Sequence, residues 1–459
     1  MLLGCTLAGC NLQSYRPQPL EPERTVAEFL ARTSDDPALR EFLARNGAPP
    51  REWPNPQWSL ADLILAALFF HPELEVARAE VAVREAAVAT AERGAPLVAR
   101  PVVEHHSRAD PGQSDWSYGL ELEFPLSGQD KREARAEEAR QRLAAARAAE
   151  AAAEWRVRSQ VRQAFVAHFA ALEDAALDTG ERSLRAAQAA ALKRRLALGA
   201  ADSAETGAAL ARLELAELRA GDSAARSRET LARLADALGL PPEAAAAMRL
   251  DFSALERTAP APSPQALREA ALRNRSDIRL GLARYAAADA GLRLAIASQY
   301  PDLRLNPAYL WDQGDNIWAL ALGIPLQLLQ DQEAPIREAD ARRELEARRF
   351  TVLQAGVIAD AAAAADAYAA SLARLAGASR AQGAAESNRD RTARALAAGQ
   401  EDRLALLEAE AQALEARRAR LSALAAAQQA WGALLDASQG GLDPAPTPAS
   451  PLALSGGQP

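Results

Sequence analysis

The 459-residue sequence has almost no cysteine, few aromatic residues and only four histidines. Both cysteines, Cys5 and Cys10, lie in the first ten residues, so the body of the chain has no disulfide, no cysteine-based metal site and no thiol nucleophile. No Gly-rich phosphate loop, zinc-helix signature or Ser/His/Asp arrangement stands out. With so few histidines for acid–base chemistry, these absences predict a protein that is not an enzyme and has no cofactor.

Positive charge is also not in excess, and no long apolar run occurs. The formal net charge is −8 and the pI is about 5.4, whereas proteins that bind nucleic acid are usually basic. We therefore expect no nucleic-acid partner. A membrane-spanning helix needs about 20 consecutive apolar residues, and no such run is found, so we expect no transmembrane helix.

Alanine makes up much of the 49% hydrophobic fraction, while aromatic residues reach only 5%. This composition favours helices that approach each other closely over a bulky globular core. Helical patterning extends from about Ser59 to Arg93, and a run without proline extends from about Asp130 to Leu198. As a helix it would be roughly 100 Å long at about 1.5 Å per residue, which is typical of a coiled-coil-like element.

A tight turn ends this long helix. Gly199 can adopt the left-handed conformation that follows many helices. Asp202, with Glu205 three residues later, has the pattern of an N-cap and capping box. A second helix then extends to about Leu238. The spacing therefore predicts a long helical hairpin.

The segment WSYGLELEFPL, residues 116–126, alternates apolar and polar side chains with a period of two. This period is typical of a strand with one apolar face, and the segment has about the 10 residues that a tilted strand needs to cross a bilayer. Aromatic residues gather near the strand ends, as in an interfacial girdle; they are Trp116, Tyr118, Tyr309, Trp311 and Trp318. If such strands close into a barrel, Glu121 and Glu123 on the polar face would face its water-filled lumen.

The plan of the chain is repeated. Leu196-x-x-Gly199-x-x-Asp202 aligns with Leu396-x-x-Gly399-x-x-Asp402, and both halves carry a predicted β-hairpin. Four strands leave two open edges, which a membrane does not tolerate, so closure requires further copies; three would supply twelve strands. The predicted segments are a remnant signal (1–10), a Pro-rich arm (11–57), repeat 1 (58–238, hairpin about 97–126), a linker (239–264), repeat 2 (265–436, hairpin about 302–326) and a disordered tail (437–459).

The N-terminus resembles the end of a bacterial lipoprotein signal. Leu7-Ala8-Gly9-Cys10 resembles a lipobox, in which cleavage precedes an acylated cysteine, and Leu2-Leu3-Gly4-Cys5 is an overlapping alternative. Cys10 is therefore the candidate lipidation residue, and Asn11 after it favours the outer membrane. Because no basic segment precedes the box, we expect that the start codon lies upstream or that the chain is truncated.

From about Ser59 to Asp436 the chain resembles the TolC-like outer membrane efflux proteins, in particular their lipoprotein branch. The resemblance is carried by the strand endings LELEFPLSG and LALGIPLQ, by the turns RLALGAADSAE and RALAAGQEDRLALLEAE, and by their duplicated order. It implies a mainly helical fold with a β-barrel part: a homotrimer with a 12-stranded barrel in the outer membrane and a 12-helix tunnel in the periplasm.

The resemblance also implies a function. The protein would be a passive exit duct of a tripartite efflux or type I secretion system, surrounded by outer membrane lipid. The linker 239–264 would belong to an equatorial girdle. A periplasmic adaptor, coupled to an inner-membrane pump of RND or ABC type, would contact the helix tips, which carry Gly199, Asp202, Gly399 and Asp402.

Two acids are candidates for the channel aperture. In the family an acidic ring lies about nine residues after the second turn glycine, where this chain has Glu408. The family often has an acid six residues after this glycine. Here that position is Ala405, while the corresponding position of repeat 1 is Glu205. A charge ring at a constriction is a common gate. The alternative is that these acids only solvate a helix surface.

Several alternatives stay open. A lipid-anchored periplasmic coiled-coil structural or adaptor protein would also be rich in long helices, but it would not need outward apolar faces on four strands. His105 and His106 are adjacent in a strand and point to opposite faces, which disfavours chelation of one metal ion. The segments YRPQPLEP and DPALREFL resemble segments of heavy-metal-efflux members of the family. The exported substrate nevertheless stays open between a drug, a metal ion and a peptide.

Overall fold

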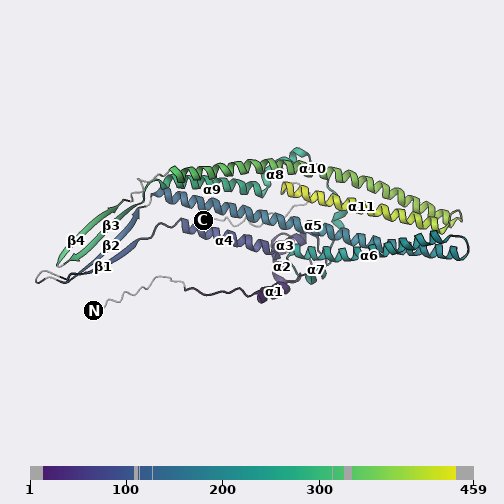
Figure 1. The fold of residues 1–459 in the computed structure, drawn as a ribbon, viewed down its shortest axis with the longest axis horizontal. Coiled ribbons are helices and arrows are strands. Elements are labelled where there is room, and N and C mark those ends of the chain that lie inside the picture. The colour runs from purple at the N-terminus through teal and green to yellow at the C-terminus, as the bar shows by residue number, and fades with distance from the viewer. Residues whose placement is uncertain are drawn as a thin grey trace.

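The protein is described by a computed structural model in which residues 14–107, 112, 114–126, 128–312, 314–324 and 333–440 are described. It is an elongated helical body with a small sheet at one end and the tips of two helical hairpins at the other (Figure 1). The candidate lipidation residue Cys10, the predicted strand-end residues Pro325 and Leu326, and the tail from residue 441 lie outside the described residues. The prediction of a mainly helical chain with a small sheet is confirmed.

Both repeats have the same order of elements: two short or medium helices, two strands, one very long helix and a returning helix. Two helices of the arm precede them, α1 (Pro22–Leu30) and α2 (Pro37–Arg45). Repeat 1 contains α3 (Leu60–Phe70), α4 (Pro72–Ala91), β1 (Val98–His105), β2 (Trp116–Leu126), α5 (Gln129–Ala197) and α6 (Ser203–Leu238). Repeat 2 contains α8 (Pro264–Asn274), α9 (Ser276–Ser298), β3 (Leu303–Asp312), β4 (Asp315–Gly323), α10 (Glu333–Ala397) and α11 (Arg403–Ser438). Between the repeats lie α7 (Pro242–Ala246) and the 3-10 helix η1 (Ser253–Glu256).

The helix predicted from Ser59 to Arg93 is divided in two, which corrects the sequence-based expectation. The break is at His71, whose backbone is extended (φ −71°, ψ 123°) because the next residue is Pro72. Proline lacks an N–H and disfavours helical geometry in the residue before it, yet it fits the first position of a new helix. Repeat 2 has an equivalent break at Arg275, between α8 and α9.

The sheet has the order β1-β2-β3-β4 and is antiparallel throughout. The β2–β3 pair joins the two repeats, and β1 and β4 are the edges. Paired residues share a face, so Tyr118 opposite Trp311 and Tyr309 opposite Trp318 belong to one apolar face. This face is largely exposed to the surroundings of the chain.

The main core lies around α3, near the middle of the long axis (Figure 1). α3 is apolar on almost every side, which is typical of a helix that is surrounded by others. Leu63, Trp58 and Phe165 are among its fully buried side chains, and Leu238 joins them from α6. A second core joins α8, α10 and α11 around Leu267, Val357, Tyr368 and Leu434.

One helix departs from the expectation that no segment could span a membrane. Over an 18-residue window, α10 is long and apolar enough by composition to do so. Only 17% of that window is buried in the chain. This stretch of α10 is therefore apolar, although the rest of the described chain covers little of it.

Candidate functional site

The tips of the two long hairpins have the same construction. Gly199 and Gly399 lie in the left-handed region, with φ of 71° and 72°, where a side chain would be strained. The Asp202 carboxylate accepts a hydrogen bond from the Glu205 N–H (2.6 Å), and that of Asp402 accepts one from the Ala405 N–H (2.8 Å). Each aspartate therefore begins its returning helix as an N-cap. Both tips lie together at the end of the molecule opposite the sheet (Figure 1).

An ion pair ties one tip to the other. Arg195, in the last turn of α5, donates from Nη2 to the Asp402 carboxylate at 2.7 Å. The N–H of Ala405 and then the Arg195 guanidinium hold the pKa of Asp402 below its usual range, because both stabilise the ionised form. The position in repeat 2 that corresponds to Arg195 is Ala395. Sequence comparison of the repeats did not identify this pair because only one repeat has the arginine.

The two candidate aperture acids lie close to these tips. Glu205 is exposed on the first turn of α6, and Glu408 is exposed on α11. Within the part of the chain that the structure describes, no hydrogen bond or ion pair joins them. Their role at an aperture stays a prediction.

The five aromatic residues of the predicted girdle lie on the apolar face of the sheet, towards its loop end. Tyr118 stacks on Trp311 with ring centroids 6.1 Å apart, and Tyr309 contacts Trp318 at 4.8 Å. Trp318 is 80% exposed, and Trp116 and Tyr118 are about half exposed. The geometry brings them together on one surface, while their contact with lipid stays a prediction.

The opposite face of the sheet is ionic. Glu123 is only 7% exposed, and its carboxylate accepts hydrogen bonds from Arg100 (2.6 Å) and Arg304 (2.8 Å) on the neighbouring strands. Glu121 accepts one from the Asn306 amide at 2.7 Å. Such paired charges are compatible with partial burial, and they make this face suited to water. The sheet therefore separates an apolar from a charged surface.

The adjacent histidines point to opposite faces, as the strand geometry predicts. His105 makes an edge contact with Trp116 on the apolar face, at 4.7 Å between centroids. The His106 Nε2 atom lies 3.0 Å from an oxygen of Asp312 and 2.8 Å from the Ser117 hydroxyl. Among the described residues, no group of three or more His, Cys, Asp or Glu could hold a metal ion.

Ion pairs also join α5 of repeat 1 to α11 of repeat 2. Arg418 donates to Asp178 (2.7 Å) and Glu181 (3.0 Å), and Arg162 lies 3.1 Å from Asp436. Burial raises the pKa of Asp174, one turn before Asp178, because a buried carboxylate loses hydration. Sequence analysis missed these pairs because each joins residues more than 230 positions apart.

Comparison with known proteins adds a match in fold. No protein-family profile matches the sequence, and no curated protein matches it. The structure of the outer-membrane channel OprN matches with 20% identity and a TM-score of 0.68, over 90% of this chain and 96% of that one. The outer membrane protein VceC from Vibrio cholerae matches with 21% identity and 0.68, over 84% and 97%.

The open-state structure of the MtrE outer membrane channel from Neisseria gonorrhoeae matches as well, with 21% identity and a TM-score of 0.66. It covers 83% of this chain and 89% of that one. The resemblance to TolC-like proteins is thus confirmed at the level of the fold. The chain therefore has the fold of bacterial outer membrane channels.

Proposed function

We propose that this protein is a trimeric outer membrane exit duct whose strands and long helices close with those of two further copies. The observation that carries this proposal is the unequal packing of the long helices. α5 packs on α3, α4 and α6 of its own repeat and also on α9 and α11 of the other repeat. α10 packs on the equivalent helices of its own repeat, α8, α9 and α11. Its two remaining sides correspond to the sides of α5 that contact repeat 2.

Repetition of the α5 geometry assigns partners to those sides: α4 and α6 of the next copy. The residues fit this assignment. On α5, Asp178 and Glu181 pair with Arg418 of α11. The corresponding residues, 200 positions away because Gly199 corresponds to Gly399, are Ala378 and Ala381 on α10 and Leu218 on α6. Leu218 is 64% exposed in the single chain.

An apolar contact would therefore replace the ion pairs where one copy meets the next. This explains why α10 is apolar and yet uncovered. Burial of a leucine side chain stabilises by roughly 1.5–3 kcal/mol. Small alanine residues opposite it allow the close approach that long helices need.

The sheet supports the same assembly. β2 pairs with β3 across the repeat boundary, and the equivalent pair between copies is β4 with β1. Three copies give a closed barrel of twelve strands, with the exposed apolar face and its girdle (Trp116, Tyr118, Tyr309, Trp311 and Trp318) toward lipid. The ionic face with Glu121 and Glu123 then lines the lumen. Closure removes every edge, which a bilayer requires.

The opposite end of the molecule would be the gate and the docking end. The turns with Gly199, Asp202, Gly399 and Asp402 would meet a periplasmic adaptor that is coupled to an inner-membrane pump of RND or ABC type. The Arg195–Asp402 pair would hold the two hairpins of one copy together in the resting state. Glu205 and Glu408 would supply the charge at the aperture, and Cys10 the lipid anchor. The duct itself is passive and catalyses no reaction.

A second possibility is a lipid-anchored coiled-coil protein that stays in the periplasm. The exposed apolar face of the sheet argues against it, since an exposed patch of this kind in water favours aggregation.

Membrane fractionation and planar bilayer recording test the proposal together. We expect the full-length protein in the outer membrane fraction, extracted only by detergent, and discrete conductance steps after reconstitution. Release without detergent, with no conductance, would support the periplasmic alternative and refute the duct.

A further inference from the structure

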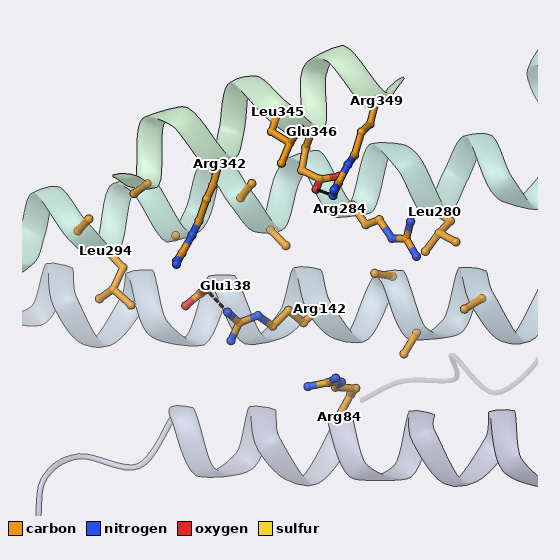
Figure 2. A pocket seen from close by; sticks show the side chains of 18 of the residues that line it. Arg84, Glu138, Arg142, Leu280, Arg284, Leu294, Arg342, Leu345, Glu346 and Arg349 are labelled. Atoms are coloured by element: carbon orange, nitrogen blue, oxygen red, sulfur yellow. Dashed lines mark hydrogen bonds and ion pairs between the residues drawn. The ribbon is translucent and has the colours of Figure 1, made fainter. Parts of the chain in front are cut away.

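A groove of about 1430 Å³ lies along the part of the helical body that is nearer the sheet. Figure 2 shows it from close by. Four helices line it, α4, α5, α9 and α10, and each does so with one face. On α4, for example, the lining residues are Val76, Ala79, Glu80, Val83 and Arg84, with the three- and four-residue spacing of a single helical stripe. One face of each of these four helices lines the groove, so the groove marks the concave side of the helical layer. When copies close as proposed above, the concave side becomes the inner wall of the tunnel.

The groove is rich in arginine, although the chain as a whole is acidic. Five arginines and four glutamates line it. Arg142 pairs with Glu138 at 2.6 Å, Arg349 with Glu346 at 2.5 Å, and Arg342 with Glu338. Arg84 and Arg284 have no ion pair with any residue that the structure describes. Two guanidinium groups in the groove are therefore available for an anion.

The side chains of Arg84 and Arg284 lie at a similar level along the helices, as Figure 2 shows. The Glu85–Arg147 ion pair (2.9 Å) fixes the level of α4 against α5, next to Arg84 and to the α5 lining residues Ala145, Ala146 and Ala149. Figure 2 shows Arg84 on α4 and Arg284 on α9 reaching toward the groove from either side of α5. The floor between them consists of alanine side chains, and Val83 and Leu280 flank it.

We propose that this groove binds organic anions, compounds that join a carboxylate or sulfonate group to an apolar body. Each planar guanidinium group, that of Arg84 or that of Arg284, can match two oxygens of such an acid group with parallel hydrogen bonds. The alanine floor and the flanking apolar side chains accept the apolar body. In a closed trimer the two arginines of each copy form a positive ring, and rings of this sign favour anions in pores. This inference rests on the proposed function for its place in a tunnel wall, and it names a class of cargo that the duct accepts.

Glu80 gives the proposal a second, opposite test. It lines the groove one turn before Arg84, and no ion pair joins the two in the described structure. Its carboxylate repels an anion held by Arg84. Removal of this charge by Glu80→Gln should therefore strengthen binding, whereas removal of the arginines should weaken it.

Isothermal titration of the full-length protein in phosphatidylcholine nanodiscs tests this. The probe is naphthalene-2-sulfonate, and its uncharged analogue naphthalene-2-sulfonamide is the control ligand. We expect the sulfonate to bind with a Kd that rises about tenfold in the Arg84→Gln/Arg284→Gln double variant, since hydrogen bonds to charged groups are lost. The Kd should fall several-fold in Glu80→Gln.

The control variant is Arg147→Gln, which removes an arginine at the same height but in an ion pair with Glu85 that faces away from the groove lining. It should leave the Kd unchanged. An unchanged Kd in the double variant, or equal binding of the sulfonamide, would overturn the proposal.

Bilayer conductance of the same preparations separates this result from the duct itself. If the protein conducts and the Kd is unchanged by loss of the arginines, anion binding in the groove is refuted and the duct proposal stands. If binding depends on the arginines but no conductance is seen, the duct proposal is refuted and anion binding in the groove stands.

Discussion

The two repeats have the same elements in the same order, yet their long helices lie in different surroundings. Each long helix buries the same set of positions against its own repeat. On α5 these are Val157, Val161, Phe165 and His168, and on α10 they are Val357, Ala361, Ala365 and Tyr368. The adjacent position differs. Arg158 of α5 is 6% exposed, whereas its counterpart Ile358 of α10 is 42% exposed.

The difference shows what duplication has kept and what it has changed. Packing within a repeat uses the same positions in both halves. The outer faces have diverged, because α5 meets charged side chains of its own chain, while α10 presents apolar side chains that no described part of the chain covers. A helix face that is covered and charged in repeat 1 but uncovered and apolar in repeat 2 supports the proposed contact with a further copy. Four changes test this comparison.

The largest effect is expected at the proposed contact between copies. Leu218→Arg places a charge opposite Ala378 of the neighbouring copy, so we expect the trimer to be lost in native mass spectrometry. Leu198→Arg, the same change at an exposed leucine of the tip, should leave assembly intact. The double variant Leu218→Arg/Ala378→Asp copies the Arg418–Asp178 pair and should restore part of the trimer. A trimer that persists in Leu218→Arg would refute this contact.

A smaller effect is expected in the two cores. Phe165 is fully buried and packs on Phe252, with ring centroids 4.7 Å apart. Phe165→Ala should lower the free energy of unfolding by about 3–5 kcal/mol, because it removes a large side chain and leaves a cavity. The reverse change in repeat 2, Ala365→Phe, should cost about 1–3 kcal/mol through overpacking. Chemical denaturation followed by circular dichroism measures both, and equal stability of Phe165→Ala and the unchanged protein would contradict this account of the core.

The tip pair should affect gating more than stability. Arg195→Ala removes an exposed ion pair that contributes up to about 1 kcal/mol, but it should raise the mean single-channel conductance in bilayers. Asp402→Asn should act in the same way, since asparagine keeps the N-cap of α11 and loses the charge. Ala395→Arg should lower conductance, because the new arginine can pair with Asp202 of the next copy. Conductance that is the same in all three variants would show that the pair is not part of a gate.

The smallest effect is a dependence of stability on pH that belongs to repeat 1. Burial lowers the pKa of His168, whose Nδ1 lies 3.0 Å from the Thr230 hydroxyl. The folded state therefore binds this proton less readily than the unfolded state, so stability should fall as pH decreases below about 6.5. His168→Asn should reduce this slope, whereas Tyr368→Phe at the equivalent position of repeat 2 should leave it unchanged. Denaturation midpoints at pH 7.5 and 5.5 are the measurement, and an identical slope in His168→Asn would contradict the assignment.

Much of the fold could be predicted because local signals determine it. The period of two at residues 116–126 and the glycine turns with their aspartate caps act through the backbone of a few neighbouring residues. The break at His71 was missed because a single proline overrides an apolar helical pattern. The contacts of Arg195 and Arg418 could not be predicted, since they join the repeats in space and have no counterpart in the other half. The arginines of the groove come from four helices, and only the fold brings them together.

The most direct test of the account is the mass of the native complex after extraction from outer membranes with detergent. We expect three copies of the chain, because two further copies would cover α10 and pair β4 with β1. A monomer or dimer, or a species released without detergent, would contradict it.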